Sequence, residues 1–350
     1  MNSNRWKLPN WLLLGIGLLP FFSLHIVYGK TPVSSTLHRI QVTSPAQLKT
    51  FFRYTSHALP LISAHRGGPV AGYPENALET FVHTLHFSHA LIECDVHLTK
   101  DGHLVLFHDN KLHRSSNGKG LIYEKTLAEL KTLRLKDPFG NVTTFSMPTF
   151  QKVLSWAKDK TVLFVDVKTK RTNWSIPVLT ADEKMRFRKV VQMIQKHKAQ
   201  SYAVVIVYNA AQARFVAQLD KHLMLSVSLG SRAKLKALLR FLPASRMIAF
   251  TGAFRRTLKP KLYAMLRTMG VMAAAGTFIF ENNLSKLAMS QKVRRAIQKK
   301  LYLHYFQSGI QIMATNHYQA VARAFSSLYK EAKKPTSKYY RYYKKFFRAP

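Results

Sequence analysis

Short apolar segments alternate with longer amphipathic segments over most of the chain, from residue 59 onward. The apolar segments have the length of strands and many β-branched residues, while the longer segments repeat apolar residues at helical spacing. The predicted strands are residues 61–64, 90–98, 104–107, 161–167, 202–208, 224–229, 247–250, 271–278 and 311–314. The predicted helices include residues 76–88, 183–196, 232–241, 259–269 and 319–330. Strands and helices that alternate in this way are typical of a parallel sheet.

The number of these units decides between two kinds of parallel sheet. About eight units over roughly 270 residues fit an α/β fold of the (β/α)8 TIM barrel type better than an open doubly wound sheet. The segment 104–107 follows the second strand through the tight polar turn Thr99-Lys100-Asp101-Gly102. We therefore expect a small hairpin insertion after the second strand and not a further barrel unit.

Residues 1–29 have the order of a secretory signal peptide. Arg5 and Lys7 precede an apolar stretch, and the small residue Gly29 stands at its end. The stretch is short for a membrane span of about 20 residues, and Pro20 and His25 interrupt its continuation. We expect cleavage near Gly29 and export to the periplasm or the medium. An uncleaved leader that anchors the protein in a membrane is the alternative.

The rest of the chain divides into three regions. Residues 30–58 form an N-terminal helical lead-in, in which Ser44 caps a helix that has Pro45 in its first turn. Residues 59–328 form the barrel. Residues 329–350 lose the periodicity and combine Lys and Arg with Tyr and Phe, which predicts a basic aromatic tail outside the barrel. This tail is either a disordered solubilising end or a segment that docks on an anionic membrane or on nucleic acid.

The chain is strongly basic. It has 54 Lys and Arg against 16 Asp and Glu in 350 residues, and a formal net charge of +38. Such a surface attracts anionic lipids, nucleic acids and small phosphate compounds alike, so the charge indicates an anionic partner without selecting one. Cys94 is the single cysteine, which excludes an intrachain disulfide and favours a buried, unreactive thiol.

Ionisable residues stand where the first predicted strands end, which is where barrel enzymes carry their active sites. His65 and Arg66 follow the first strand, and two glycines after them permit a tight backbone next to a ligand. In the second strand the period of two places Glu93 and Asp95 on one face. Adjacent carboxylates repel each other unless a cation lies between them, and oxygen ligands suit Ca²⁺ or Mg²⁺ better than zinc.

Further candidates follow from the same alternation. His97 shares the face of the two carboxylates; it is either a nitrogen ligand or, as we favour, a residue lower in the barrel or on its outside. The hairpin strand leads into His108, and the carboxylate of Asp109 can fix the tautomer of this histidine. The third barrel strand ends in Asp166 and Lys168, which share one face and offer a third metal ligand and a cation for a phosphate.

The order of these residues resembles that of the glycerophosphodiester phosphodiesterase family over roughly residues 59–325. The resemblance rests on His65-Arg66, Tyr73-Pro74-Glu75-Asn76, Glu93-x-Asp95, His108-Asp109, Arg114-Ser115-Ser116-Asn117-Gly118 and Met147-Pro148-Thr149-Phe150. It implies a (β/α)8 barrel, one divalent cation, Ca²⁺ or Mg²⁺, and hydrolysis of glycerophosphodiesters to glycerol 3-phosphate and an alcohol.

The resemblance also implies a role for each residue. The implied metal ligands are Glu93, Asp95 and Asp166, the implied acid–base pair is His65 and His108, and the implied phosphate contacts are Arg66 and Lys168. Glu75, Asn76 and Asp109 are expected to shape or orient the site. Asp166 stands where the family more often has Glu, and Thr315-Asn316 stands where Thr-Asp is usual at the eighth strand.

Two other functions are open at this point. One is a lysophospholipase D or sphingomyelinase D activity on lipid headgroups, which related barrels support with the same residues. The other is a catalytically silent barrel that binds anionic lipid, lipopolysaccharide or nucleic acid, although the intact set of histidines and carboxylates argues against it. The expected partners are a small glycerophosphodiester or a lysophospholipid and, through the basic tail, an anionic membrane surface; nucleic acid is disfavoured.

Overall fold

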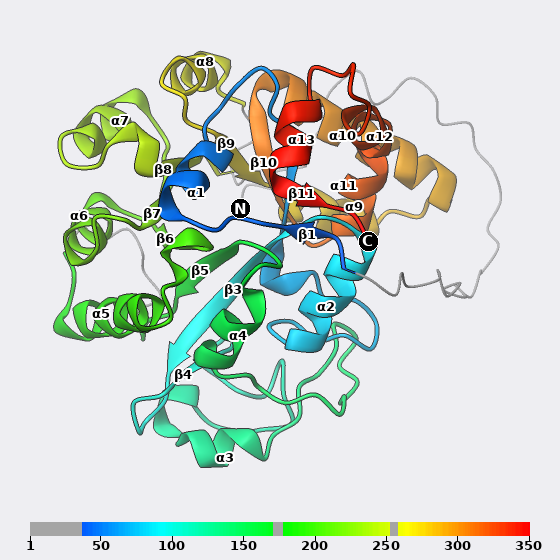
Figure 1. Ribbon diagram of the computed structural model, residues 1–350. Coiled ribbons are helices and arrows are strands. Elements are labelled where there is room, and N and C mark those ends of the chain that lie inside the picture. Colours follow the sequence, from blue (N-terminus) through cyan, green and yellow to red (C-terminus); the bar gives the residue numbers. More distant parts are fainter. Residues whose placement is uncertain (1–36, 171–177, 253–257) are drawn as a thin grey trace, which may run out of the picture. The chain divides into compact units, whose positions relative to one another are not determined.

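The computed structural model describes residues 37–170, 178–252 and 258–350, so the predicted signal peptide 1–29 and the start of the lead-in lie outside the described residues. Eight parallel strands form a closed barrel, because β2 pairs with β3 on one side and with β10 on the other (Figure 1). The strands are β2 (Leu61–Ala64), β3 (Leu91–Leu98), β5 (Leu163–Val167), β6 (Ala203–Val207), β7 (Met224–Ser228), β8 (Met247–Phe250), β9 (Ala273–Gly276) and β10 (Ile310–Thr315). The predicted barrel is confirmed.

Helices surround the barrel and connect its strands. They are α2 (Leu78–Phe87), α4 (Phe150–Ala157), α5 (Ala181–Lys196), α6 (Ala210–Leu219), α7 (Arg232–Leu239), α8 (Pro260–Thr268), α9 (Phe278–Ser285), α10 (Gln291–Ser308) and α11 (Tyr318–Ala324). Local sequence explains where several of them begin. In α5, for example, Thr180 and Glu183 form a capping box that satisfies the free N–H groups of the first turn. In the described chain, no helix is both long enough and apolar enough to cross a membrane.

Most predicted elements match the observed ones to within two residues at each end, but two of them differ in a way that changes the local structure. The helix predicted over 319–330 is divided at Phe325 into α11 and α12 (Ser326–Ala332). The strand predicted over 271–278 is also shorter, because β9 ends at Gly276 and Phe278 already begins α9. The second difference matters for function, since it brings an aromatic ring to the end of the barrel where the site lies.

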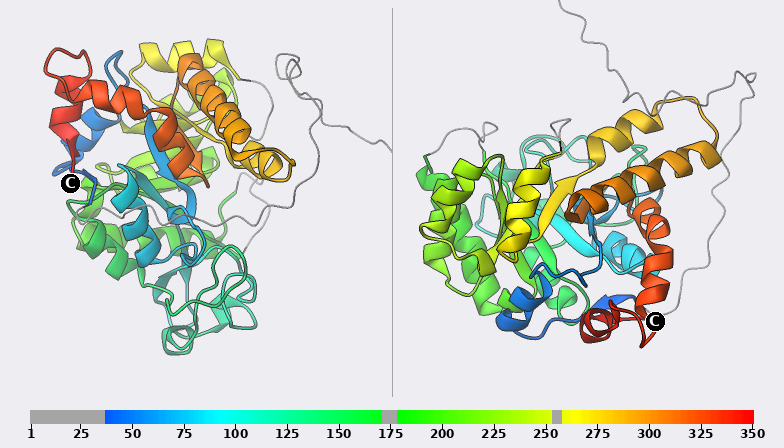
Figure 2. Two further views of the ribbon diagram at one scale, coloured as in Figure 1. Left: turned by 90° about the vertical axis from the view of Figure 1, so that its right-hand side faces the viewer. Right: turned by 90° about the horizontal axis from the view of Figure 1, so that it is seen from above.

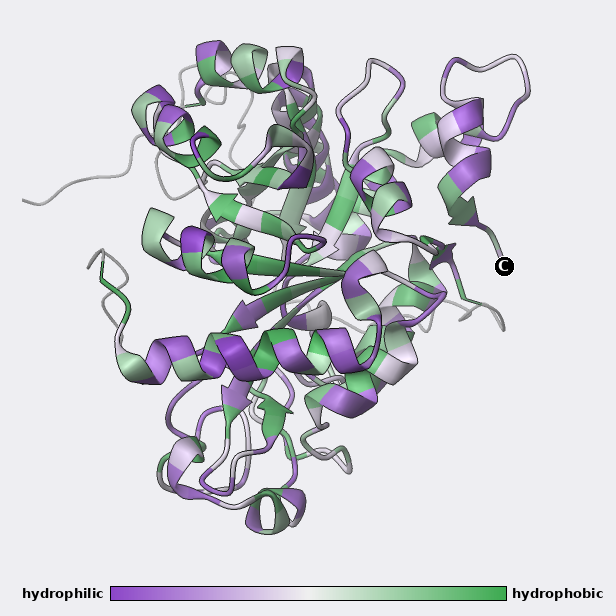
Figure 3. Ribbon diagram, turned by 60° about the vertical axis from the view of Figure 1, so that its left-hand side comes forward, coloured by the Kyte–Doolittle hydropathy of each residue, from purple (hydrophilic) through white to green (hydrophobic). Residues whose placement is uncertain are grey.

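A hydrophobic cluster closes one end of the barrel. It contains residues from the beginning of the strands, among them Leu61, Leu91, Val204, Met224, Ile248 and Ile312. Phe51 and Phe52, at the end of α1 (Pro45–Phe51), belong to the same cluster and are almost fully buried. Figure 3 shows the strands as predominantly hydrophobic and the surrounding helices as mixed. Because this end is filled with apolar side chains, polar groups gather at the carboxyl end of the strands.

The C-terminal segment is folded, so it is not the disordered end that was one of the two alternatives for residues 329–350. α13 (Tyr340–Phe346) leads into β11 (Phe347–Arg348), which pairs antiparallel with β1 (Arg39–Ile40). Phe346 and Phe347 are buried with the α1 residues, and α1 and α13 lie at the same end of the barrel (Figure 2). Lys344 and Lys345 are exposed, while Phe346 and Phe347 beside them are buried.

The predicted hairpin is confirmed and belongs to a larger insertion. β4 (Leu104–Leu106) pairs antiparallel with the end of β3, and the chain then continues through α3 (Leu127–Lys131) before it reaches α4. The insertion has a small core of its own, which consists of Ala77, Val105, Phe107, Leu112, Ile122, Leu130, Leu135 and Met147. Gly72, in the loop after β2, donates a backbone hydrogen bond of 3.0 Å to Asp137 in the insertion. The insertion is thus attached to the loop that carries the first candidate residues.

Candidate active site

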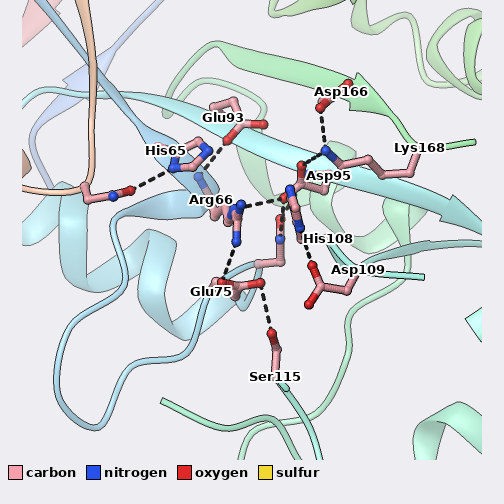
Figure 4. Close-up of polar contacts among 12 residues, drawn as sticks. His65, Arg66, Glu75, Glu93, Asp95, His108, Asp109, Ser115, Asp166 and Lys168 are labelled. Carbon is pink, nitrogen blue, oxygen red and sulfur yellow. Dashed lines mark hydrogen bonds and ion pairs between the residues drawn. The ribbon is translucent and has the colours of Figure 1, made fainter. Parts of the chain in front are cut away.

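The structure brings every predicted site residue into one network at the carboxyl end of the strands (Figure 4). The pairing register makes Asp95 of β3 and Asp166 of β5 direct neighbours. His65 follows β2, Lys168 follows β5, and His108 follows β4. Strands of a parallel barrel end at the same rim, so residues that are far apart in the chain meet there.

Three carboxylates form the centre of this network. Glu93, Asp95 and Asp166 are buried, and one oxygen from each lies within 4.8 Å of the other two. Burial raises the pKa of Glu93 well above its usual value, and the charges of Asp95 and Asp166 add to this effect. Oδ1 of Asp166 is buried and has no hydrogen-bond partner among the residues that the structure describes. A donor set of oxygens alone with an unpartnered buried oxygen fits a hard divalent cation.

Two neighbouring side chains hold these carboxylates in place. Nδ2 of Asn76 donates to Oδ2 of Asp95 at 2.7 Å, and Oδ1 of Asn76 accepts from the backbone N of Asp95 at 3.0 Å. The hydroxyl of Tyr208 donates to Oδ2 of Asp166 at 2.8 Å. The sequence analysis did not identify Tyr208 as a site residue, although it stands at the end of the predicted strand 202–208.

Lys168 lies between two of the carboxylates. Its Nζ is 2.8 Å from Oδ1 of Asp95 and 2.6 Å from Oδ2 of Asp166. Burial alone would lower the pKa of Lys168, but the two carboxylates outweigh it and raise this pKa well above its usual value. Burial likewise favours a higher pKa for Asp95, but Lys168, His108 and Arg66 hold the pKa of Asp95 well below its usual value.

The loop after β2 has an unusual backbone that presents Arg66 to the site. Arg66 itself has a φ of 54°, and its backbone N donates to Oε2 of Glu93 at 2.7 Å. A Cβ atom on Gly67 would lie 2.2 Å from the ring of Phe81, and one on Gly68 would lie 2.5 Å from the ring of Tyr318. The two glycines therefore let the loop pack closely against helices α2 and α11.

A chain of ion pairs connects Arg66 with His108. Arg66 pairs with Glu75 at 2.9 Å, and Glu75 accepts two hydrogen bonds from Arg114, at 2.6 and 3.0 Å. Arg114 also binds Asp109, whose Oδ1 lies 2.5 Å from Nδ1 of His108. Burial favours a higher pKa for Asp109, but His108 and Arg114 hold it well below its usual value. Arg114 is a further site residue. It belongs to one of the motifs of the family resemblance, but no role was predicted for it.

His65 is held by two residues that follow the last two barrel strands, Phe278 after β9 and Asn316 after β10. Its Nδ1 lies 2.7 Å from Oδ1 of Asn316, and its ring packs against the ring of Phe278 with 4.5 Å between centroids. Burial, together with the charge of Arg66, lowers the pKa of His65 to about 4. His65 is therefore neutral near pH 7. The Asn316 contact was not foreseen, because the sequence analysis treated this position only as a departure from the family pattern.

His97 lies outside the group of carboxylates. It is buried, and its Nε2 lies 3.1 Å from the backbone O of His108. It supports the loop after β4, which agrees with the interpretation that it is not a metal ligand.

A family model for the glycerophosphoryl diester phosphodiesterase family matches residues 65–308 of the chain, which include the barrel strands from β3 to β9. The chain belongs to this family. The match contains every candidate residue described above except Asn316, which lies beyond its end. The order of motifs on which the resemblance rested therefore identified the family correctly.

Curated relatives within the glycerophosphodiester phosphodiesterase family match part of the chain. The glycerophosphodiester phosphodiesterase of Bacillus altitudinis is 30% identical over 167 residues, which are 47% of this chain and 65% of that protein. The enzyme of the same name from Caldanaerobacter subterraneus is 30% identical over 168 residues, which are 48% and 65% of the two chains. The chain thus matches slightly less than two thirds of the length of these relatives.

Solved structures in the family agree with the fold. The glycerophosphoryl diester phosphodiesterase of Parabacteroides distasonis has a TM-score of 0.75 and 30% identity, and the match covers 90% of this chain and 100% of that one. An Oleispira antarctica phosphodiesterase, solved with the product sn-glycerol-3-phosphate, has a TM-score of 0.57 and 18% identity, with 77% and 97% covered. The latter likeness shows the shared barrel.

Proposed function

We propose that the protein is a metal-dependent glycerophosphodiester phosphodiesterase that releases glycerol 3-phosphate and an alcohol. The observation that carries the proposal is the convergence of three carboxylates, two histidines and two cationic side chains at one end of the barrel. Family membership supports it, as do the named activity of the Bacillus altitudinis relative and the product held by the Oleispira antarctica enzyme.

Glu93, Asp95 and Asp166 would hold one divalent cation, Ca²⁺ or Mg²⁺. When bound, this cation supplies positive charge that stabilises the phosphoryl oxygens of the substrate. Arg66 and Lys168 would bind the same phosphate with their cationic side chains, because both lie beside Asp95 of the carboxylate group. Their charges favour a phosphodiester over a neutral ester at this position.

His65 and His108 would exchange the protons of the reaction. Each uses Nδ1 for a contact within the protein, with Asn316 and Asp109 respectively, so each has Nε2 left for the substrate. One histidine removes the proton of the nucleophile as its oxygen bonds to phosphorus. The other donates a proton to the oxygen of the departing alcohol as the second P–O bond breaks. The nucleophile is water, or the neighbouring glycerol hydroxyl in a route through a cyclic phosphate.

Residues 1–29 have the features of an export signal, and a periplasmic or secreted enzyme would act on glycerophosphodiesters outside the cytoplasm. Exposed Lys344 and Lys345 would contribute only long-range attraction to an anionic membrane, because the aromatic residues beside them are buried. A lysophospholipid is the second candidate substrate, and the assay includes it beside the glycerophosphodiester.

The test is release of glycerol 3-phosphate from glycerophosphocholine, and of choline from lysophosphatidylcholine, by the purified protein with Ca²⁺ or Mg²⁺. EDTA should abolish the activity. His65→Ala and His108→Ala should each lower kcat by about 10²-fold or more. His113→Ala changes an exposed histidine of the insertion and serves as the matched control. Absence of hydrolysis with either cation and several headgroups would reject the proposal.

A further inference from the structure

A buried carboxylate outside the metal group lies directly behind His65. Glu281, in the first turns of α9, is 1% exposed. It accepts hydrogen bonds from the hydroxyls of Thr277 at 2.6 Å, Tyr302 at 2.8 Å and Thr315 at 2.5 Å, and from the backbone N of Asn316 at 3.1 Å. Within the described residues, no cationic side chain forms an ion pair with it. A buried charge without a cation is costly unless several donors converge on it, so the donors are essential to this arrangement.

The donors come from the two segments that hold His65. Thr315 is the last residue of β10 and Asn316 follows it, and Asn316 presents its Oδ1 to Nδ1 of His65 at 2.7 Å. Thr277 precedes α9, whose first residue, Phe278, packs its ring against His65. The backbone N of Glu281 also donates to the O of Thr277 at 3.0 Å, so the first turn of α9 is fixed from both sides.

We propose that Glu281 is a positioning residue for His65, which it orients through Asn316 on one side and through the start of α9 on the other. The amide oxygen of Asn316 can only accept a hydrogen bond, so the proton of neutral His65 lies on Nδ1 and leaves Nε2 facing the substrate. Glu281 keeps that oxygen in place because it binds the backbone of the same asparagine. The inference rests on the proposed function, in which His65 transfers a proton.

The arrangement also has a chemical consequence for the asparagine. A carboxylate at position 316 would add a second negative charge to a residue whose backbone N already binds Glu281. An amide is neutral and adds no such charge, while it still selects the tautomer of His65. Glu281 and Asn316 therefore act as one unit.

The experiment compares Glu281→Gln, Asn316→Ala and the double variant in the full-length protein. Glu281→Gln keeps the shape but turns an N–H group toward hydrogen-bond donors, so the strand end should shift. We expect kcat to fall about tenfold or more in each single variant, with KM changed less than about twofold. The double variant should lose less than the product of the two single losses, because part of the effect of Glu281 passes through Asn316 and the rest through the start of α9.

Nitrogen-15 NMR of the histidines gives a reading that does not depend on activity. Wild-type His65 should be the Nδ1–H tautomer, and Glu281→Gln and Asn316→Ala should both yield a mixture of tautomers. An unchanged tautomer and kcat in Glu281→Gln, or additive losses in the double variant, would overturn the proposal. If the wild-type protein has no phosphodiesterase activity, the proposed function fails while the tautomer comparison still decides whether Glu281 orients His65.

Two further variants complete the experiment, one as a milder substitution and one as a control. Thr315→Val removes a single hydroxyl donor to Glu281 and replaces Glu281→Gln in the NMR measurement if that variant does not fold. The same mixture of His65 tautomers is expected. An unchanged tautomer in Thr315→Val would overturn the proposal. Asp220→Asn is the matched control, because Asp220 is also a buried, hydrogen-bonded carboxylate but lies before β7, at the opposite end of the barrel. It should leave kcat and the tautomer of His65 unchanged.

Discussion

Asn76 binds Asp95 at two points, since its amide group donates to Oδ2 at 2.7 Å and accepts from the backbone N at 3.0 Å. Asn76 can do so because it adopts a φ of 59°, a left-handed conformation that asparagine tolerates better than most residues. The asparagine is fully buried. It therefore fixes the central carboxylate of the candidate metal group in one orientation.

Asn76→Ala should weaken binding of Ca²⁺ or Mg²⁺ by about 10- to 100-fold, because the ligand it orients becomes free to rotate. Isothermal titration calorimetry with the metal alone measures this effect. Asn117→Ala, which changes an exposed asparagine of the insertion, should bind the cation as the wild type does. Equal affinity of the two variants would show that Asp95 needs no such support.

Tyr208→Phe should lower cation affinity while the fold is retained. The substitution removes the hydroxyl that donates to Oδ2 of Asp166 and leaves the ring in place. We expect a decrease of about tenfold, at the lower end of the range for residues that support metal ligands. Tyr340→Phe, in the C-terminal helix, is the control, and calorimetry is again the measurement. An unchanged affinity would mean that Lys168 alone suffices to hold Asp166.

Arg114→Ala should lower kcat/KM by about 10- to 100-fold, because it releases both Glu75 and Asp109 from one guanidinium group. Arg114→Lys should not restore the activity, since a single ammonium group cannot reproduce the paired contacts. Steady-state kinetics on glycerophosphocholine measure both variants. Arg134→Ala is the control, because its guanidinium binds backbone carbonyls within the insertion. Full activity of the lysine variant would contradict the role in positioning.

Phe346→Ala should destabilise the protein by about 3–5 kcal/mol, the usual cost of removing a buried phenyl ring. The ring is 1% exposed and packs on Phe51 with 5.0 Å between centroids. Chemical denaturation followed by circular dichroism measures the free energy of unfolding. Lys345→Ala, at the exposed neighbouring position, should change it by less than about 0.5 kcal/mol. If both variants had the same stability, the C-terminal segment would not be docked on the barrel.

Stability should fall as the pH falls below 6.5, in part because of His89. Burial, followed by the charge of His38, lowers the pKa of His89 to about 3 in the folded protein, against 6.5 for an unperturbed histidine. Between these values the unfolded chain binds more protons, so the contribution of His89 is complete above pH 6.5 and is lost as the pH falls toward 3.

His89→Phe should flatten this dependence, since phenylalanine does not titrate. The difference between the variants should amount to about 2 kcal/mol between pH 6.5 and 4.5, at about 1.4 kcal/mol for each pKa unit. Denaturation curves at several pH values, with exposed His113→Phe as the control, measure it. Parallel slopes for His89→Phe and the wild type would contradict the assignment.

The sequence alone determined the barrel and the candidate residues at its rim. Both depend on local patterns: apolar runs of strand length, a period of two that places Glu93 and Asp95 together, and histidines that follow the strands. Such patterns are visible in a single chain because the conformation of a strand is set within a few residues. The family order added the roles expected of Arg66 and Lys168.

Tertiary structure alone decided which groups support these residues. His65 meets Asn316 across 251 positions of sequence, and that contact exists only because β10 closes the barrel against β2. Arg114 reaches the site through the folding of the insertion, and the C-terminal aromatic residues become core because β11 pairs with β1. Local periodicity carries no information about such distant partners. They follow from the closed geometry of the barrel, which places the first strand beside the last.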